Sequence, residues 1–268
     1  MEAIGTLLEL FPHSIVAGVL IAAACAALGV FVILKRMVFI GAVLSEVAAA
    51  GLALAMVWHA PPLLGAASLT LAVSWGLSRP FETTRIPRDA ILGTLFAAAA
   101  ALSVLLAARA GLGLEEIKTL LYGDLILTRR ADLLPITIGV LPAGLLLACG
   151  LRPIVHTFMD RESARIMNVR VNRWEIAFFL ALALVISLAS RVAGAMLVFA
   201  YLVMPSSAAL LLSRRLGIVM LLAAGLAVGA TLAGLYASLV WDLPTNQLIV
   251  AFLALTLPLA AIKRSLID

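Results

Sequence analysis

The chain has 268 residues, of which 64% are hydrophobic and only 12% are charged, and its mean hydropathy is +1.17. A water-soluble domain of this length does not need so much apolar surface, so the composition indicates a membrane protein with several spans. The net charge of +5 comes from Lys and Arg scattered at the ends of apolar runs, where membrane topology explains them, and it does not indicate binding to nucleic acid.

The apolar runs have the length of transmembrane helices. About 20 residues cross the hydrocarbon core as a helix, whereas a transmembrane barrel would show short alternating segments. The sequence therefore predicts an all-α polytopic protein with eight or nine transmembrane helices in a single domain, 1–268. The weakest run is interrupted by Gly194 and Pro205, which is typical of a broken or re-entrant helix. The predicted spans are 14–34, 38–57, 61–78, 89–108, 131–151, 174–190, 192–212, 217–240 and 247–262.

The basic residues predict how the chain is oriented. If nine spans begin with the N-terminus outside, 14 of the 19 Lys and Arg residues fall on the cytoplasmic side, as the positive-inside rule expects. Four of the other five lie between 109 and 130. The distribution favours an N-terminus outside and a C-terminus in the cytoplasm, and we expect a multi-pass protein of the inner (cytoplasmic) membrane.

Two segments are too charged to be spans. The segment 113–130, GLEEIKTLLYGDLILTRR, combines charges with a Leu-rich face, which predicts an interfacial helix or one that lines a vestibule. The segment 152–173 is the largest charged block. Its centre, DRESARIM, has Asp160 and Glu162 before Arg165, the order that suits the dipole of a short helix. In the favoured topology this block is cytoplasmic, which makes it the best docking surface for a partner protein.

The chain has no sequence pattern for nucleotide hydrolysis. None of its three lysines follows a glycine, so the phosphate-binding pattern GxxxxGK[ST] does not occur. The patterns HExxH and GxSxG are also missing, and the sequence predicts no catalytic residue and no covalently bound cofactor. If the chain transports a solute at the expense of ATP, the hydrolysis takes place on a separate subunit.

The second predicted span carries an acid, Glu46, near its middle. A charged group at this depth costs about 2.5 to 3.5 kcal/mol on insertion scales, so its helix face matters. The residues within about 60 degrees of Glu46 are small, which indicates that the acid points inward rather than to lipid. Glu46, with Ser45 beside it, is then either part of a substrate path or a packing device hydrogen-bonded to a neighbouring helix. The small residues on its face are Ala42, Ala49, Ala50 and Ala53.

Several motifs, in order along nearly the whole chain, resemble those of one transporter family. The segment RMVFIGAVLSEVAAAGLALA at 36–55 resembles the signature of the zinc/manganese-type ABC permeases, which usually read close to RMAYFGDALSHSALPGVALG. The co-linear set is more specific than any single piece. The further matches are DAILGTLFAAA at 89–99, LLYGDLI at 120–126, FMDRESARIMNV at 158–169 and VAGAMLVFAYLVMPSSAALLL at 192–212.

The resemblance implies an ABC importer permease fold and a specific set of partners. Members of this family work as a dimer of two permease copies with two ATP-binding subunits, and they receive a divalent metal such as zinc, manganese or iron from an extracytoplasmic metal-binding protein. The block 158–169 matches the cytoplasmic coupling helix of the family. The residues that the resemblance assigns to ATPase coupling are Asp160, Glu162, Ala164 and Arg165.

The signature departs from the family at the metal position. Where the family has an aspartate and, four residues later, a histidine on the same helix face, this chain has Ala42 and Glu46. A carboxylate alone selects zinc less well than an imidazole does. Glu46 is thus the single candidate ligand for a divalent metal cargo, and two alternatives stay open. One is import of a metal chelate, and the other is an ion- or proton-coupled secondary transporter that uses Glu46, for which no internal inverted repeat is visible.

Overall fold

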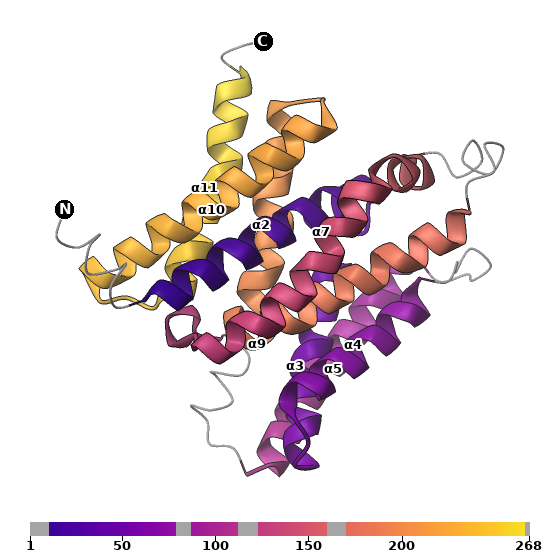
Figure 1. The fold of residues 1–268 in the computed structure, drawn as a ribbon, viewed down its shortest axis with the longest axis vertical. Coiled ribbons are helices and arrows are strands. Elements are labelled where there is room, and N and C mark those ends of the chain that lie inside the picture. The colour runs from indigo at the N-terminus through magenta and orange to yellow at the C-terminus, as the bar shows by residue number, and fades with distance from the viewer. Residues whose placement is uncertain (1–10, 79–86, 112–122, 160–169, 266–268) are drawn as a thin grey trace.

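The fold is all-α, as predicted. The computed structural model describes residues 11–78, 87–111, 123–159 and 170–265, and within these ranges it contains helices and no strand (Figure 1). In the same ranges, one 3-10 turn, η1 (Leu125–Leu127), precedes the helix α7 (Arg130–Met159). The α-helices are α2 (Pro12–Leu34), α3 (Ile40–Val57), α4 (Pro62–Leu77), α5 (Arg88–Arg109), α7 (Arg130–Met159), α9 (Val171–Leu212), α10 (Leu216–Trp241) and α11 (Thr245–Ser265).

Each predicted span coincides with a helix or with half of one. Seven of the described helices are long and apolar enough to cross a membrane, and α4 is a shorter apolar helix of 16 residues. The helix α9 has 42 residues and includes both 174–190 and 192–212 without a loop between them, and its kink at Gly194 lies near the start of the second predicted span. The prediction that Gly194 breaks this region is confirmed. Pro205 does not break it, because the helix continues to Leu212.

The two charged segments fold differently from the prediction at their described ends. The helix α7 continues to Met159, so the first residues of the block 152–173 belong to a long helix. In the segment 113–130, the residues before 123 lie outside the described ranges, and the described remainder forms η1 instead of an α-helix. At η1, the Asp124 side chain accepts a hydrogen bond from the Ile126 amide, which favours a tight turn over a continued helix.

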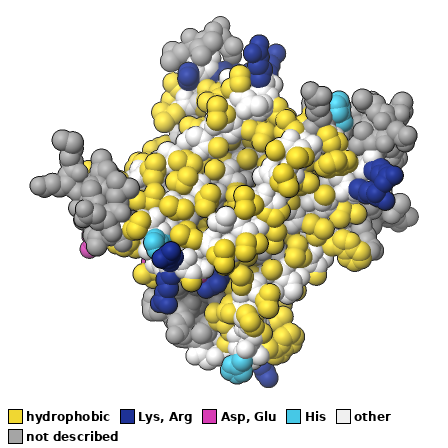
Figure 2. All heavy atoms as spheres, viewed as in Figure 1, with side chains coloured by type: hydrophobic (Ala, Val, Ile, Leu, Met, Phe, Trp, Pro, Cys, Tyr) yellow, Lys and Arg dark blue, Asp and Glu magenta, His cyan; other side chains and the backbone are white. Residues whose placement is uncertain are grey.

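The helices are arranged around α9. In Figure 1, α10 and α11 lie on one side, α3, α4 and α5 lie on the other, and α2, α7 and α9 lie between them. The most hydrophobic window of α3 is 78% buried, whereas the corresponding window of α5 is 22% buried. The core therefore includes α3, while much of the surface of α5 is exposed in the single chain. Figure 2 shows the apolar side chains that cover one face, with Lys and Arg mostly near its edges.

Two ion pairs between helix ends agree with the predicted orientation of the helices that they join. Asp132 at the start of α7 pairs with Arg191 just before the kink of α9, at 3.1 Å. Lys35 at the end of α2 pairs with Glu175 near the start of α9. The predicted topology places both members of each pair on the same side of the membrane, with the two pairs on opposite sides. The contacts therefore agree with the predicted path of α2, of α7 and of the first half of α9.

A close crossing of α2 and α9 holds the centre of the fold together. At Gly29 a Cβ atom would overlap the backbone carbonyl of Leu202, so only glycine fits there. One turn along α9, the Ser206 hydroxyl donates a hydrogen bond to the Ala26 carbonyl oxygen at 2.8 Å. Close backbone approach and hydrogen bonds between helices provide much of the attraction between helices in lipid, where apolar burial contributes little.

Replacing Gly29 with Ala is expected to destabilise the protein, because the added methyl group forces α2 and α9 apart. Overpacking of this kind costs about 1–3 kcal/mol and more where backbone must move. The midpoint of thermal unfolding in detergent should therefore fall. Gly93→Ala in α5 is the matched control, because a Cβ atom there meets no neighbour within 4 Å. Equal unfolding midpoints for the two variants would contradict the close crossing.

Candidate functional site

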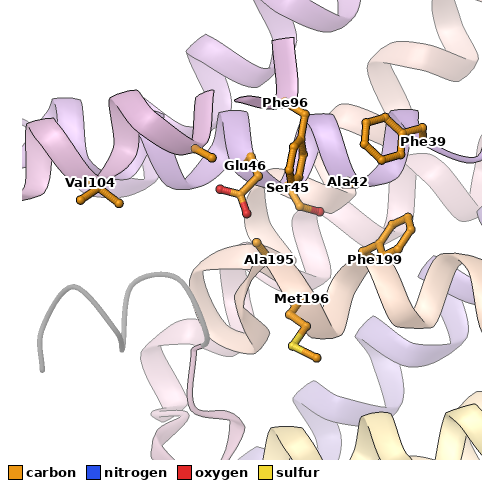
Figure 3. A pocket seen from close by; sticks show the side chains of 10 residues that line it. Phe39, Ala42, Ser45, Glu46, Phe96, Val104, Ala195, Met196 and Phe199 are labelled. Carbon is orange, nitrogen blue, oxygen red and sulfur yellow. The ribbon is translucent and has the colours of Figure 1, made fainter. Parts of the chain in front are cut away.

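A cavity of about 380 Å³ lies between α3, α5 and α9 (Figure 3). Its walls are largely apolar, with aromatic rings from three different elements. Among the described residues that line it, Glu46 alone carries a charge. The lining residues are Phe39, Ala42, Ser45, Glu46, Phe96, Ala100, Val104, Ala195, Met196 and Phe199.

The carboxylate of Glu46 points into the space between α3 and α9, above Ala195 in Figure 3. Its Oε2 atom is buried and has no hydrogen-bond partner within the described part of the chain. A buried polar atom without a partner is costly and rare in folded proteins, so such an atom needs an explanation. A glutamate that serves only to pack helices would bond to a neighbouring helix, and among the described residues the Oε2 atom of Glu46 has no such bond.

The sequence predicted that the face of α3 with Glu46 and the small residues points inward, and this is confirmed in part. Ala42 lines the cavity one turn from Glu46, as the helical spacing predicts. However, Leu44 and Val47, which point away from the acid, are also buried, at 0% and 3% exposure. The reason is that α4, α5 and α9 all pack against α3. The helix is central, and its small-residue face is therefore not its only inward face.

Ser45 lines the cavity, but its hydroxyl group already has a partner. It donates a hydrogen bond to the Gly41 carbonyl oxygen of the preceding turn, at 2.8 Å. This is the usual arrangement for a serine inside a helix. The hydroxyl oxygen keeps lone pairs that a passing cation can use, so a place for Ser45 in the transport path stays a prediction.

A kink in α9 forms the wall opposite Glu46. Gly194 has φ 76 and ψ 161, a conformation that L side chains rarely adopt, and Ala195 and Met196 in the cavity wall follow it directly. The kink leaves the Ala193 carbonyl available, and the Asn246 side-chain amide donates a hydrogen bond to it at 3.0 Å. A kink stabilised by side chains of other helices is how membrane proteins keep irregular backbone at membrane depth.

The same side chain joins the kink to η1. The Asn246 Oδ1 atom accepts a hydrogen bond from the Leu125 amide at 3.3 Å, and the backbone of Gly123 lies directly against that of Gly194. Sequence reasoning identified Gly194 but missed Asn246. The only available signal was an amide side chain at the start of a strongly apolar run.

The described flanks of the predicted coupling block meet in a buried charged cluster. The ammonium of Lys35, at the end of α2, pairs with the Glu175 carboxylate of α9, and the two side chains are 11% and 8% exposed. The Lys35 Nζ atom also lies over two aromatic rings, 4.6 Å from the centroid of Phe158 and 4.4 Å from that of Phe179. In the sequence, Lys35 is only one of the 14 Lys and Arg residues on the predicted cytoplasmic side, because nothing local in the sequence links it to Glu175.

The residues assigned to ATPase coupling lie outside the described residues, so their roles stay predictions. They are Asp160, Glu162, Ala164 and Arg165.

The donors for a metal ion in the cavity are few. No group of three or more His, Cys, Asp and Glu side chains that could hold a metal ion occurs in the described ranges. The cavity offers the Glu46 carboxylate, the Ser45 hydroxyl and the Met196 thioether. One carboxylate with two weak donors is suited to brief contact with a partly hydrated cation rather than to a tight structural metal site.

Comparisons with known proteins agree on one family. The sequence model of the ABC 3 transport family matches residues 8–264. The manganese transport system membrane protein MntC of Halalkalibacterium halodurans is 29% identical, over 89% of this chain and 82% of that protein. The high-affinity zinc uptake system membrane protein ZnuB of Haemophilus influenzae is 26% identical, over 75% of this chain and 76% of that protein. The fold is similar to that of PsaBC from Streptococcus pneumoniae, solved in complex with Fab, with a TM-score of 0.85, 21% identity, and coverage of 97% of this chain and 94% of that one.

Proposed function

Because the chain belongs to the ABC 3 transport family, we propose that it is the membrane subunit of an ATP-driven importer of a divalent metal ion, with Glu46 in the path of the cargo. The named relatives transport manganese and zinc, which supports this cargo class. The observation that carries the assignment of Glu46 is its buried carboxylate oxygen Oε2, which lies on the wall of a cavity and has no hydrogen-bond partner among the described residues. It occupies the position where the family signature has a histidine.

The proposed assembly follows the family. Two copies of this chain, in the inner membrane with a cytoplasmic C-terminus, combine with two ATP-binding subunits and receive the metal from an extracytoplasmic binding protein. ATP hydrolysis belongs to the separate subunits. Asp160, Glu162, Ala164 and Arg165 would contact them, because a short charged segment between two helices is suited to seating in a groove of a partner.

The cavity gives Glu46 a transport role that its chemistry can fulfil. In surroundings of low dielectric constant, one carboxylate attracts a divalent cation much more strongly than it does in water. Transport also requires release, and a site with a single charged ligand binds weakly enough to let the ion leave. Alternating access then needs the walls of the cavity to move, and α9 has a kink at the point where it meets the cavity.

The cavity also supports a second form of the cargo. Its volume of about 380 Å³ and the rings of Phe39, Phe96 and Phe199 in its wall exceed what a single ion needs. An apolar wall with one carboxylate suits a metal bound to a small organic chelator. Calorimetry or native mass spectrometry of the cognate binding protein distinguishes the two forms, because a free ion there excludes the chelate.

The proposed function is tested by reconstitution. The chain is placed in liposomes with its ATP-binding subunit and binding protein, and the uptake of zinc, manganese and iron, free and chelated, is measured by mass spectrometry of the elements. ATP-dependent uptake of at least one metal is expected. If no metal is taken up in any form, the proposal is wrong, and uptake that persists without the ATP-binding subunit would identify a secondary transporter instead.

A further inference from the structure

Three helices meet at the ammonium group of Lys35. This residue ends α2, its ion-pair partner Glu175 belongs to α9, and the rings on which it lies belong to Phe158 of α7 and Phe179 of α9. Phe158 and Phe178 also contact each other edge to face, at 4.9 Å between centroids. The cluster thus joins the ends of α2 and α7 to the start of α9.

The position of this cluster along the chain is informative. Phe158 and Glu175 lie near the two helix ends that flank residues 160–169, the segment between α7 and α9. On its other side, Lys35 is four residues from Phe39, which lines the Glu46 cavity. The turn between them is short and tied, since the Met37 amide donates to the Val32 carbonyl oxygen at 3.1 Å. A displacement of the flanks of 160–169 therefore reaches the cavity wall through few residues.

A buried ion pair is a poor means of adding stability. Removing two charges from water costs about as much as their attraction returns, so apolar replacements of similar volume are often neutral or stabilising. Leaving one charge without its partner is strongly destabilising. Such a pair is best suited to fixing a register or a switch, because it favours a small number of discrete arrangements. The aromatic faces add to this by accepting the ammonium in a definite position.

We propose that the Lys35–Glu175 pair, held against Phe158 and Phe179, passes movement from the flanks of segment 160–169 to the wall of the Glu46 cavity. The pair is a positioning element: it does not contact the cargo, and it acts through the α2–α3 turn on Phe39 and α3. The inference rests on the proposed function, because it requires an ATP-binding subunit that drives the movement.

The test measures the cavity directly. In a Cys149→Ser background, which removes the exposed thiol and leaves the buried Cys25, Ala42→Cys places a reporter on the cavity wall. The rate of its alkylation is measured in the membrane-embedded complex with the ATP-binding subunit, with and without a non-hydrolysable ATP analogue. The ratio of the two rates should differ clearly from one in this parent. This ratio should return to about one when Lys35→Met and Glu175→Leu are added. The apolar pair keeps the packing, but it lacks the ion pair that fixes the position of α2 relative to α9.

A matched control comes from an ion pair that joins α9 to a different helix, α7. Asp132 of α7 and Arg191 of α9 pair at 3.1 Å, far along both helices from segment 160–169. Asp132→Asn with Arg191→Gln should leave the nucleotide effect as it is in the parent. If the Lys35→Met/Glu175→Leu complex does not assemble, Lys35→Gln with Glu175→Gln, which also removes both charges but keeps polar side chains, is measured in the same way.

The outcomes separate this inference from the proposed function. A nucleotide effect that survives removal of the Lys35–Glu175 charges, or that is missing from the parent, overturns the inference. The alkylation rate requires no cargo, so a complex that responds to nucleotide but imports no metal would count against the proposed cargo alone.

Discussion

Replacing Glu46 with Gln is expected to reduce ATP-dependent metal uptake by at least about tenfold, the lower end of what disturbing a metal ligand costs. The substitution keeps the size of the side chain and removes the only charge among the described lining residues. Without that charge, an apolar cavity has little to offset the loss of the ion's hydration shell. Uptake is measured in proteoliposomes, and assembly is followed by co-purification with the ATP-binding subunit, which should be unaffected.

Asp242→Asn provides the matched control for this prediction. It makes the same change from carboxylate to amide at an exposed residue after α10, where the left-handed backbone conformation (φ 51) also suits asparagine. Uptake by this variant should equal that of the unmodified protein. If Glu46→Gln were to transport metal at the same rate as Asp242→Asn, Glu46 would be a packing residue and not part of the transport path.

Rebuilding the family pair should change which metal is preferred. Ala42 and Glu46 are one turn apart and both line the cavity, so Ala42→Asp with Glu46→His places a carboxylate and an imidazole where a single ion can contact both. Imidazole favours zinc over manganese, so the ratio of zinc to manganese uptake should rise by about tenfold, which corresponds to roughly 1.4 kcal/mol of added preference. Competition between the two metals in one uptake assay measures this ratio directly.

Ala42→Asp alone is the control for the pair. It adds a hard oxygen ligand without an imidazole. The ratio of zinc to manganese uptake should therefore stay at the value of the unmodified protein, whatever the total uptake. If the single and double variants showed the same ratio, the two positions would not hold one ion together, and the transported species would bind elsewhere in the path.

Hydropathy and charge predicted the helices well, because the bilayer imposes its own length and polarity on each span. Hydropathy and charge did not predict the features that depend on how neighbouring helices pack. Pro205 interrupts the sequence pattern but not α9, and α7 likewise contains Pro135, Pro142 and Pro153. Within a bundle, neighbouring helices and local adjustments compensate for the hydrogen bonds that proline removes.

The candidate site was predictable only in part. The period of a helix places Ala42 beside Glu46 whatever surrounds them, and this part was correct. The shape of the cavity depends on α5 and on the kinked α9, which are 50 to 150 residues away in sequence. The same holds for the Lys35–Glu175 pair, whose members are separated by 140 positions. No local pattern records which distant helix will lie opposite a given side chain.

The hydrogen bond from Asn246 to the kink of α9 has a consequence for how the protein is made. Asn246 lies in the first turn of α11, whereas the Ala193 carbonyl that it binds is synthesised 53 residues earlier. The kink therefore lacks this partner until α11 has left the ribosome and entered the membrane. The wall of the cavity next to Gly194 is completed only at that stage of biogenesis, after α3, α5 and α9, which form the rest of the wall, have been synthesised.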